Sequence, residues 1–297
     1  MFICNLCPRK CSAVRDDESN MGGFCAMPEK FKIARAMLHT GEEPCISGKN
    51  GSAAIFFSGC NLKCVFCQNY DISHKNEGRI VDDEELADII GQMIDAGAHN
   101  INLVNPTHYA KRISDFFEKY HFDVPVIYNT SSYEEVETLK MLEGKIDVYL
   151  PDLKYIRSDK SLKYSGVSDY FEKASKAVLE MIRQFGAPQF DENSMIKKGV
   201  IVRHLILPSN TNSSIEILKW LDENVCDETL ISLMAQYTPL GESEKYPEIS
   251  RRLTERELKK TVDFLENECS LDGYVQEIES ANICFVPDFK NGGFLKR

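Results

Sequence analysis

The chain has 297 residues and a formal net charge of -11, and its hydrophobic content of 43% is that of an ordinary soluble globular protein. The negative charge argues against a nucleic-acid backbone or an anionic membrane as the main partner. The first residues lack a signal-peptide pattern and no apolar run approaches the ~18 residues of a membrane span, so we expect a cytoplasmic protein.

The first fifty residues are rich in cysteine, and we interpret residues 1–50 as a small metal-binding extension. A cytoplasmic compartment keeps thiols reduced, so a disulfide framework is not expected. Four cysteines at this spacing can supply all the ligands of one metal site. The site could be a structural zinc or an iron–sulfur cluster that relays electrons, and the alternative is that the four cysteines are free thiols. These candidate ligands are Cys4, Cys7, Cys11 and Cys25.

Two other features of the chain are given an ordinary structural interpretation. Glu42 and Glu43 are interpreted as a solvated charge pair. Seven of the cysteines fall into two clusters, at residues 4–25 and 60–67, and the four cysteines outside these clusters are expected to be small buried hydrophobic residues. These are Cys45, Cys226, Cys269 and Cys284.

From residue 51 onward, short apolar segments alternate with segments of helical periodicity. The best-defined helix begins at Asp82, which forms a capping-box-like pair with Glu85, and a later one begins with Thr254 and Glu257. Alternation of this kind predicts βα units on a parallel sheet, either doubly wound or a full or partial barrel. The expected strands are 52–57, 101–104, 124–128, 146–150, 199–207 and 229–234.

Three cysteines, Cys60, Cys64 and Cys67, follow the first of these strands, where a ligand-binding loop belongs. Three thiolates at this spacing could be three corners of a zinc site with Cys45 or His74 as the fourth ligand. They could also hold three irons of a 4Fe-4S cluster and leave one iron open for another ligand.

The pattern Cys-x3-Cys-x2-Cys, with Phe66 before the last cysteine, resembles the radical S-adenosylmethionine (SAM) superfamily. The string FFSGCNLKCVFCQN is similar to the branch containing the activating enzymes of pyruvate formate-lyase and other glycyl radical enzymes. Further segments along nearly the whole chain have counterparts there, including CNLCPRKC, INLVNPTHY, YNTSSYE, LPDLKY, VRHLILP and MAQYTP.

This resemblance implies an α/β fold in which residues 51–297 form a partial (β/α)6-type TIM barrel of parallel strands. It implies that the three loop cysteines bind a 4Fe-4S cluster, and that SAM binds to the open iron and is reductively cleaved to a 5'-deoxyadenosyl radical. A reactive radical needs a closed, dry cavity, which a loop-capped barrel provides. The implied partners are a glycyl radical enzyme or a peptide substrate, and an electron donor such as flavodoxin or ferredoxin.

Polar residues at the strand ends are the remaining candidates. In the superfamily a Gly-Gly-Glu-Pro-like turn binds the SAM amino group. Here the turn is Asn105-Pro106-Thr107-His108, in which Asn105 and Thr107 offer oxygens for an ammonium group, although Thr107 could instead cap the next helix. His108 is a candidate proton donor, with a structural role as the alternative.

Three further strand ends carry candidates for the SAM site. Asn129 and Ser131 lie where activating enzymes have an acidic turn that helps to hold a cation, and Asn129 replaces the acid by an amide. Asp152 and Lys154 match that family's Asp-Leu-Lys, which implies that Lys154 pairs with the SAM carboxylate and that Asp152 binds a cation or orients its neighbours. A solvated surface turn is the alternative for this pair. Arg203 lies inside an apolar strand, where it either contacts SAM or forms a structural ion pair.

The sequence therefore predicts a radical SAM oxidoreductase that activates a glycyl radical enzyme. One alternative is radical SAM chemistry on another peptide or a small molecule. The other is a non-catalytic iron–sulfur or zinc binding module, which leaves Asp152, Lys154 and Arg203 without a purpose.

Overall fold

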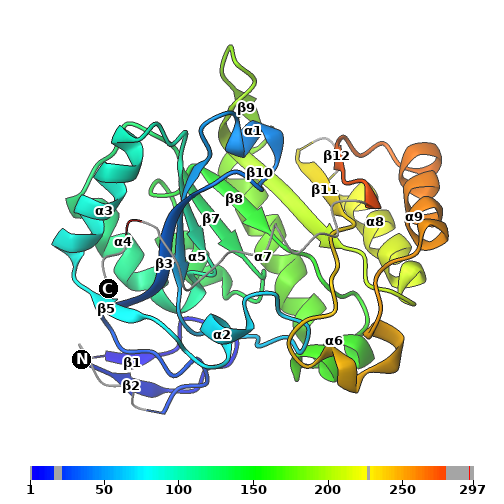
Figure 1. The fold of residues 1–297 in the computed structure, drawn as a ribbon, viewed down its shortest axis with the longest axis horizontal. Helices are drawn as coiled ribbons and strands as arrows, with labels where there is room; N and C mark the ends of the chain where they lie inside the picture. Colours follow the sequence, from blue (N-terminus) through cyan, green and yellow to red (C-terminus); the bar gives the residue numbers. More distant parts are fainter. Residues whose placement is uncertain (1, 17–21, 226–227, 279–293, 295–297) are drawn as a thin grey trace.

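The computed structural model describes residues 2–16, 22–225, 228–278 and 294. Its centre is a large, mostly parallel sheet with the strand order β12-β11-β10-β8-β7-β6-β4-β3-β5 (Figure 1). The parallel strands are β4 (Ser52–Phe57), β6 (Ile101–Val104), β7 (Val126–Thr130), β8 (Val148–Pro151), β10 (Ile196–Leu205), β11 (Leu230–Met234) and β12 (Gly273–Val275).

The expected α/β class and partial barrel are confirmed, since all six predicted strands are present in parallel register. Within the described residues the path of strands ends at β5 on one side and β12 on the other, so no closed barrel forms there. In the same part of the chain, no helix combines the length and apolar character needed to cross a bilayer.

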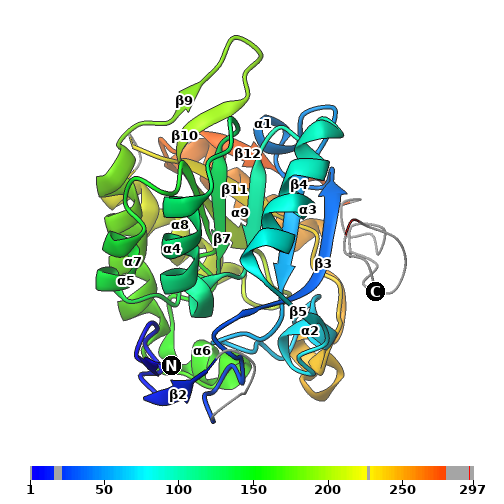
Figure 2. The ribbon, with the colours of Figure 1, turned by 90° about the vertical axis from the view of Figure 1, so that its left-hand side faces the viewer.

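Helices form an outer layer around this sheet, and the largest apolar cluster fills the space between them and the strands (Figure 2). In chain order the α-helices are α1 (Pro44–Ser47), α2 (Tyr70–Ser73), α3 (Asp83–Asp95), α4 (Ala110–Lys119), α5 (Val136–Met141), α6 (Ser158–Ser165), α7 (Tyr170–Phe185), α8 (Thr211–Val225) and α9 (Glu255–Glu268). Short 3-10 turns span η1 (Thr107–Tyr109), η2 (Ser243–Lys245) and η3 (Pro247–Ile249).

Two helix starts follow the predicted capping chemistry. The Asp82 carboxylate accepts a hydrogen bond from the Glu85 N–H at 2.8 Å, at the start of α3. At α9, Thr254 and Glu257 form a complete capping box. Each of these contacts satisfies a backbone donor that the helix itself leaves unpaired.

The first fifty residues are divided between two parts of the structure. β1 (Phe2–Cys4) and β2 (Ala13–Arg15) form a separate antiparallel ribbon, whereas β3 (Phe31–His39) pairs antiparallel with β4 in the large sheet. β5 (Arg79–Val81) extends that edge, and β9 (Gln189–Phe190) pairs with β10. The division of the chain into domains 1–50 and 51–297 stays a prediction, and β3 is the part of residues 1–50 that joins the sheet.

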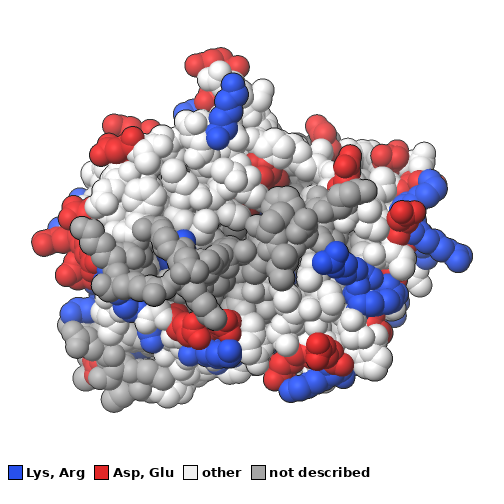
Figure 3. Space-filling model, in the orientation of Figure 1, with Lys and Arg blue, Asp and Glu red and all other residues white. Residues whose placement is uncertain are grey.

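The ribbon, α2 and α6 lie together at the lower end of the molecule in Figures 1 and 2, whereas α1 and β9 lie at the upper end. The segment after β4 runs to α2, so the carboxyl ends of the parallel strands meet at the lower end. On the face shown in Figure 3, acidic and basic side chains are interspersed, mostly around the rim.

Candidate functional site

The three loop cysteines follow β4 directly and lie at the carboxyl end of the sheet. Cys60 and Cys64 are buried and Cys67 is half-buried. The Cys60 sulfur accepts hydrogen bonds from the backbone N–H groups of Leu62 and Lys63, at 3.3 and 3.4 Å. Lys63 has a φ of 55°, a left-handed conformation that turns the chain around this sulfur.

The other two sulfurs accept hydrogen bonds from serine hydroxyls. Ser165, at the end of α6, donates to the Cys64 sulfur at 3.0 Å, and Ser73 of α2 donates to the Cys67 sulfur at 3.4 Å. Burial raises the pKa of the Cys67 thiol to about 12 and also raises the pKa of Cys64. Free thiols at Cys64 and Cys67 are therefore protonated at neutral pH, and a metal centre must displace those protons to bind.

A half-buried cation faces this loop from the end of β8. Lys154 lies close to Cys64 and Cys67 and forms an ion pair with Asp152. Burial lowers the pKa of Lys154, but the negative charge of Asp152 more than offsets this effect, so the pKa lies above its ordinary value and the ammonium group stays charged. The loop therefore has hydrogen-bond donors on each sulfur and a positive charge at its inner side.

Alternation along β8 explains why Lys154 points inward. Val148 and Leu150 belong to the apolar cluster that fills the inner side of the sheet, and Asp152 and Lys154 continue the same two-residue period. The side chains on the inner face of β8 thus change from apolar to charged toward the carboxyl end of the strand. The predicted pair of Asp152 and Lys154 is brought together at the loop of cysteines.

Arg203 of β10 is engaged in a buried ion pair. Its guanidinium donates to both Glu43 carboxylate oxygens, at 2.9 and 2.7 Å, and also to Glu42. The interpretation of Glu42 and Glu43 as a solvated pair is wrong, because the Glu43 side chain is buried and both carboxylates face this arginine. Of the two alternatives for Arg203, the structure shows the ion pair, while contact with SAM stays a prediction.

The turn after β6 places its two candidate residues differently. The Asn105 side chain donates to the Gly59 carbonyl at 3.0 Å, next to Cys60. Thr107 is fully buried, and its hydroxyl donates at 2.5 Å to the carboxylate of Glu134. Glu134 comes from the loop after β7 and also accepts a hydrogen bond from Thr130 at 2.6 Å. SAM binding by Asn105 and Thr107 stays a prediction.

His108 is hydrogen-bonded to the backbone just before the loop of cysteines. Its ring Nε2 donates to the Ser58 carbonyl at 2.8 Å, two residues before Cys60. Burial, with a contribution from the nearby Arg15, lowers the pKa of His108 to about 3, so the ring is neutral at physiological pH. This environment favours the structural interpretation of His108, and proton donation stays a prediction.

The turn after β7 presents backbone groups to its neighbours. The Asn129 carbonyl accepts a hydrogen bond from the Asn105 N–H at 2.8 Å. The Ser131 carbonyl accepts one from the Tyr170 hydroxyl at 2.8 Å, and the Ser131 hydroxyl is buried without a partner in the described residues. A buried hydroxyl of this kind is available to a bound ligand.

A family model described as the radical SAM superfamily matches residues 54–221. That match covers more than half of the chain and includes the three loop cysteines. The chain belongs to the radical SAM superfamily. The family implies a 4Fe-4S cluster and SAM, and the protein is an enzyme of radical SAM type.

Similar proteins include the uncharacterized protein MJ0674 of Methanocaldococcus jannaschii, which is 32% identical over 273 residues, covering 89% of this chain and 74% of the relative. Among solved structures, methylornithine synthase (PylB) is 16% identical with a TM-score of 0.50, over 82% of this chain and 72% of that one. Streptococcus suis SuiB bound to S-adenosylmethionine is 15% identical with a TM-score of 0.49 over 74% of this chain. The chain spans 48% of the SuiB length.

The residues of this radical SAM protein fit a 4Fe-4S cluster. Three thiols project from one loop, each sulfur has a hydrogen-bond donor, and Lys154 supplies the positive charge that a thiolate-ligated cluster favours. In the described residues, no three His, Cys, Asp or Glu side chains are already closed onto a single-ion position. Assignment of individual ligands to Cys60, Cys64 and Cys67 stays a prediction.

Several residues around the site were missed from the sequence. Ser165 and Ser73 follow no motif, and only the fold brings them to the sulfurs. Glu134 lies in the segment YNTSSYE, and an acidic residue just after a strand end is a signal that could have identified it. Two of the scattered cysteines can be placed: Cys45 is buried as expected and Cys269 is half-buried, while Cys226 and Cys284 lie outside the described residues.

Glu134 leads to a testable pH dependence. Burial raises its pKa to about 7, so between pH ~4.5 and ~7 the folded chain binds more protons than the unfolded chain. The free energy of unfolding therefore falls as the pH rises through this window, by about 3 kcal/mol in total for a pKa shift of this size. Glu134→Gln removes this dependence, and urea unfolding of the reduced apo chain at pH 5 and pH 8 measures it. Identical pH slopes for the variant and the wild type would contradict this assignment.

Proposed function

We propose that this radical SAM enzyme activates a glycyl radical enzyme by abstracting a hydrogen atom from one of its backbone glycines. The observation that carries the proposal is the Asp-Leu-Lys sequence of the activating enzymes at the end of β8, with the half-buried Lys154 ammonium close to Cys64 and Cys67. When bound, the cluster supplies the electron that cleaves SAM to methionine and a 5'-deoxyadenosyl radical.

The chain's own residues have three tasks in this proposal. Cys60, Cys64 and Cys67 hold the cluster, and Lys154 pairs with the SAM carboxylate while Asp152 fixes the lysine in place. Aromatic packing of Phe66 against Tyr155, Tyr164 and Tyr237 helps to keep water from the loop, at ring-centroid distances of 5.9 to 6.5 Å.

In the reaction, a C–H bond of the glycine breaks, and the hydrogen atom completes the methyl group of 5'-deoxyadenosine. The radical is left on the glycine, and the electron comes from a low-potential donor such as flavodoxin or ferredoxin. One departure from the activating enzymes favours a second candidate. Asn129 stands where their acid helps to hold a cation, which supports radical chemistry on another peptide or a small molecule.

The test is anaerobic incubation of the reconstituted enzyme with SAM, reduced flavodoxin and pyruvate formate-lyase in its non-radical form. We expect a glycyl radical doublet by electron paramagnetic resonance, one 5'-deoxyadenosine per radical, and deuterium transfer from a deuterated glycine. Cleavage of SAM that is unaffected by pyruvate formate-lyase and by a peptide of its glycine loop would favour the second candidate. The non-catalytic module would be favoured by the absence of both product and any effect of SAM on the cluster spectrum.

A further inference from the structure

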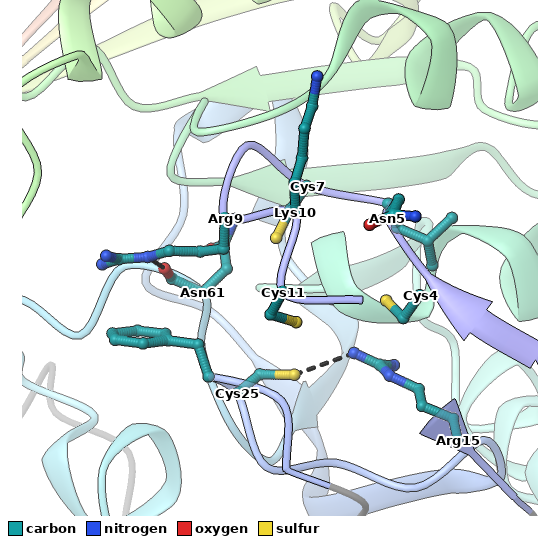
Figure 4. Close-up of a pocket in the computed structure, with 11 residues that line it drawn as sticks. Cys4, Asn5, Cys7, Arg9, Lys10, Cys11, Arg15, Cys25 and Asn61 are labelled. Carbon is teal, nitrogen blue, oxygen red and sulfur yellow. Dashed lines mark hydrogen bonds between the residues drawn. The ribbon is translucent and has the colours of Figure 1, made fainter. Parts of the chain in front are cut away.

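The four N-terminal cysteines line one cavity. Cys4 ends β1, Cys7 and Cys11 flank the turn that follows, and Cys25 lies before β3. Their sulfur atoms point toward a common space of about 10 Å³, close to the room that one water molecule needs (Figure 4). Lys10, beside Cys11, has a φ of 41°, so the chain bends back at this point and brings Cys11 toward Cys7.

A buried cation, Arg15, faces these sulfurs. Arg15 is 3% exposed, and its guanidinium donates to the Cys25 sulfur at 2.9 Å and to the His108 carbonyl at 2.5 Å. Its Nε has no hydrogen-bond partner in the described residues. A buried charge is costly unless it is compensated, and thiolates beside it are the groups that can carry the negative charge.

Three of the four thiols, those of Cys4, Cys7 and Cys25, are buried, and Cys11 is exposed. A divalent metal ion displaces the protons of the thiols that bind it, and four thiolates around such an ion carry a net negative charge that matches a neighbouring guanidinium.

We propose that Cys4, Cys7, Cys11 and Cys25 bind one zinc ion as a tetrathiolate centre, and that this centre holds Arg9 against the loop of Cys60, Cys64 and Cys67. Four thiolates at one place are the full ligand set of a structural zinc ion. No three of these side chains are already closed onto one ion position, so zinc binding requires rotation of the cysteine side chains.

Arg9, between Cys7 and Cys11, connects the two groups of cysteines. Its Nε donates to the Asn61 carbonyl at 2.9 Å, inside the loop of Cys60, Cys64 and Cys67. Another guanidinium nitrogen donates at 3.4 Å to the carbonyl of Ser165, whose hydroxyl contacts the Cys64 sulfur. The guanidinium carbon lies 3.7 Å from the centre of the Phe24 ring, next to Cys25.

A second contact joins the same two segments. Gly59, next to Cys60, has a φ of 80°, and a Cβ at this position would lie 2.9 Å from the Cys25 carbonyl oxygen. The backbone at Gly59 therefore lies so close to the backbone at Cys25 that only glycine fits at this position. Arg9 is thus a positioning residue for the loop, and the tetrathiolate centre fixes the turn from which it projects.

The first test uses the full chain in which Cys60, Cys64 and Cys67 are all replaced by alanine, so that a 4Fe-4S cluster cannot bind at that loop. We expect about one zinc per chain by mass spectrometry of metals, with no acid-labile sulfide. Adding Cys7→Ser should release the zinc, while adding Cys269→Ser, at a half-buried position just after α9, should not. Absence of metal, or zinc that survives Cys7→Ser, would overturn the proposal, and iron with labile sulfide would overturn the single-ion centre.

A second measurement needs no change at the four cysteines. In the same triple-alanine chain, alkylation with iodoacetamide should spare Cys4, Cys7, Cys11 and Cys25 until a chelator removes the zinc. Cobalt added to the stripped chain should give the visible bands of a tetrahedral cobalt–thiolate centre. Alkylation of exposed Cys11 that is equally fast before and after chelation would contradict metal binding there.

The positioning role of Arg9 rests on the loop holding the cluster and is tested separately in the otherwise wild-type chain. Arg9→Ala should retain zinc but change the midpoint potential and the SAM-induced spectral shift of the cluster, because two loop carbonyls, those of Asn61 and Leu62, lose their donor, as does the carbonyl of Ser165. Arg9→Lys should restore part of the change. A potential and spectrum identical to those of the wild type would remove the positioning role and leave the zinc assignment to the first test.

Discussion

Replacement of Cys64 by alanine is expected to reduce formation of 5'-deoxyadenosine at least ~10³-fold, which corresponds to about 4 kcal/mol of lost catalysis. Cys64 is the middle cysteine of the loop, and its sulfur is buried close to Lys154. The measurement is anaerobic reconstitution with iron and sulfide, followed by addition of dithionite and SAM and chromatography of the products.

A matched variant separates loss of the ligand from a general disturbance of the loop. Ser165→Ala removes the hydroxyl that donates to the Cys64 sulfur but keeps the cysteine, so the cluster should bind and its reduction potential should rise or fall measurably. Cys269→Ser should behave like the wild type. Cys64→Ala with full iron content at the loop and unchanged product would remove Cys64 from the proposed ligand set.

The strands of the large sheet could be predicted because they are buried on both faces. SAAIFF and INLV, for example, read as continuous apolar runs and form β4 and β6. The same rule failed for β3, whose sequence FKIARAMLH alternates charged and apolar residues. β3 is an antiparallel strand near the edge of the sheet, and its pairing with β4 and β5 is a long-range contact that local pattern does not encode.

The candidate site was predictable where one strand carries the signal. Asp152 and Lys154 share a strand end and a two-residue period, and they form a pair beside the cysteines. The ion pair of Arg203 with Glu42 and Glu43 joins residues about 160 positions apart, so the sequence could offer the pair only as one alternative and could not name its partner. Thr107 and Glu134 illustrate the same limit, since each comes from a different strand end.

Loss of the Arg203 guanidinium is the second large effect that we expect. Arg203→Met leaves the carboxylates of Glu42 and Glu43 buried without their cation, which should destabilise the fold by about 3–5 kcal/mol. Urea unfolding of the reduced apo chain measures this loss. The triple variant Arg203→Met, Glu42→Gln, Glu43→Gln is the matched control and should recover most of the stability, because it removes the unpaired charges and keeps their volume.

The pH dependence of the same variant distinguishes an ion pair from a SAM contact. Burial raises the pKa of Glu43, but Arg203 more than offsets this, so the folded pKa lies below the ordinary value of about 4.5. The stability that this pair contributes is therefore present above pH ~4.5 and lost as the pH falls through the folded pKa. The difference between wild type and Arg203→Met should shrink in acid. A variant with wild-type stability at pH 7 and a large rise in the KM for SAM would instead establish Arg203 as a SAM contact, because the guanidinium would then act on the substrate and not on its two carboxylates.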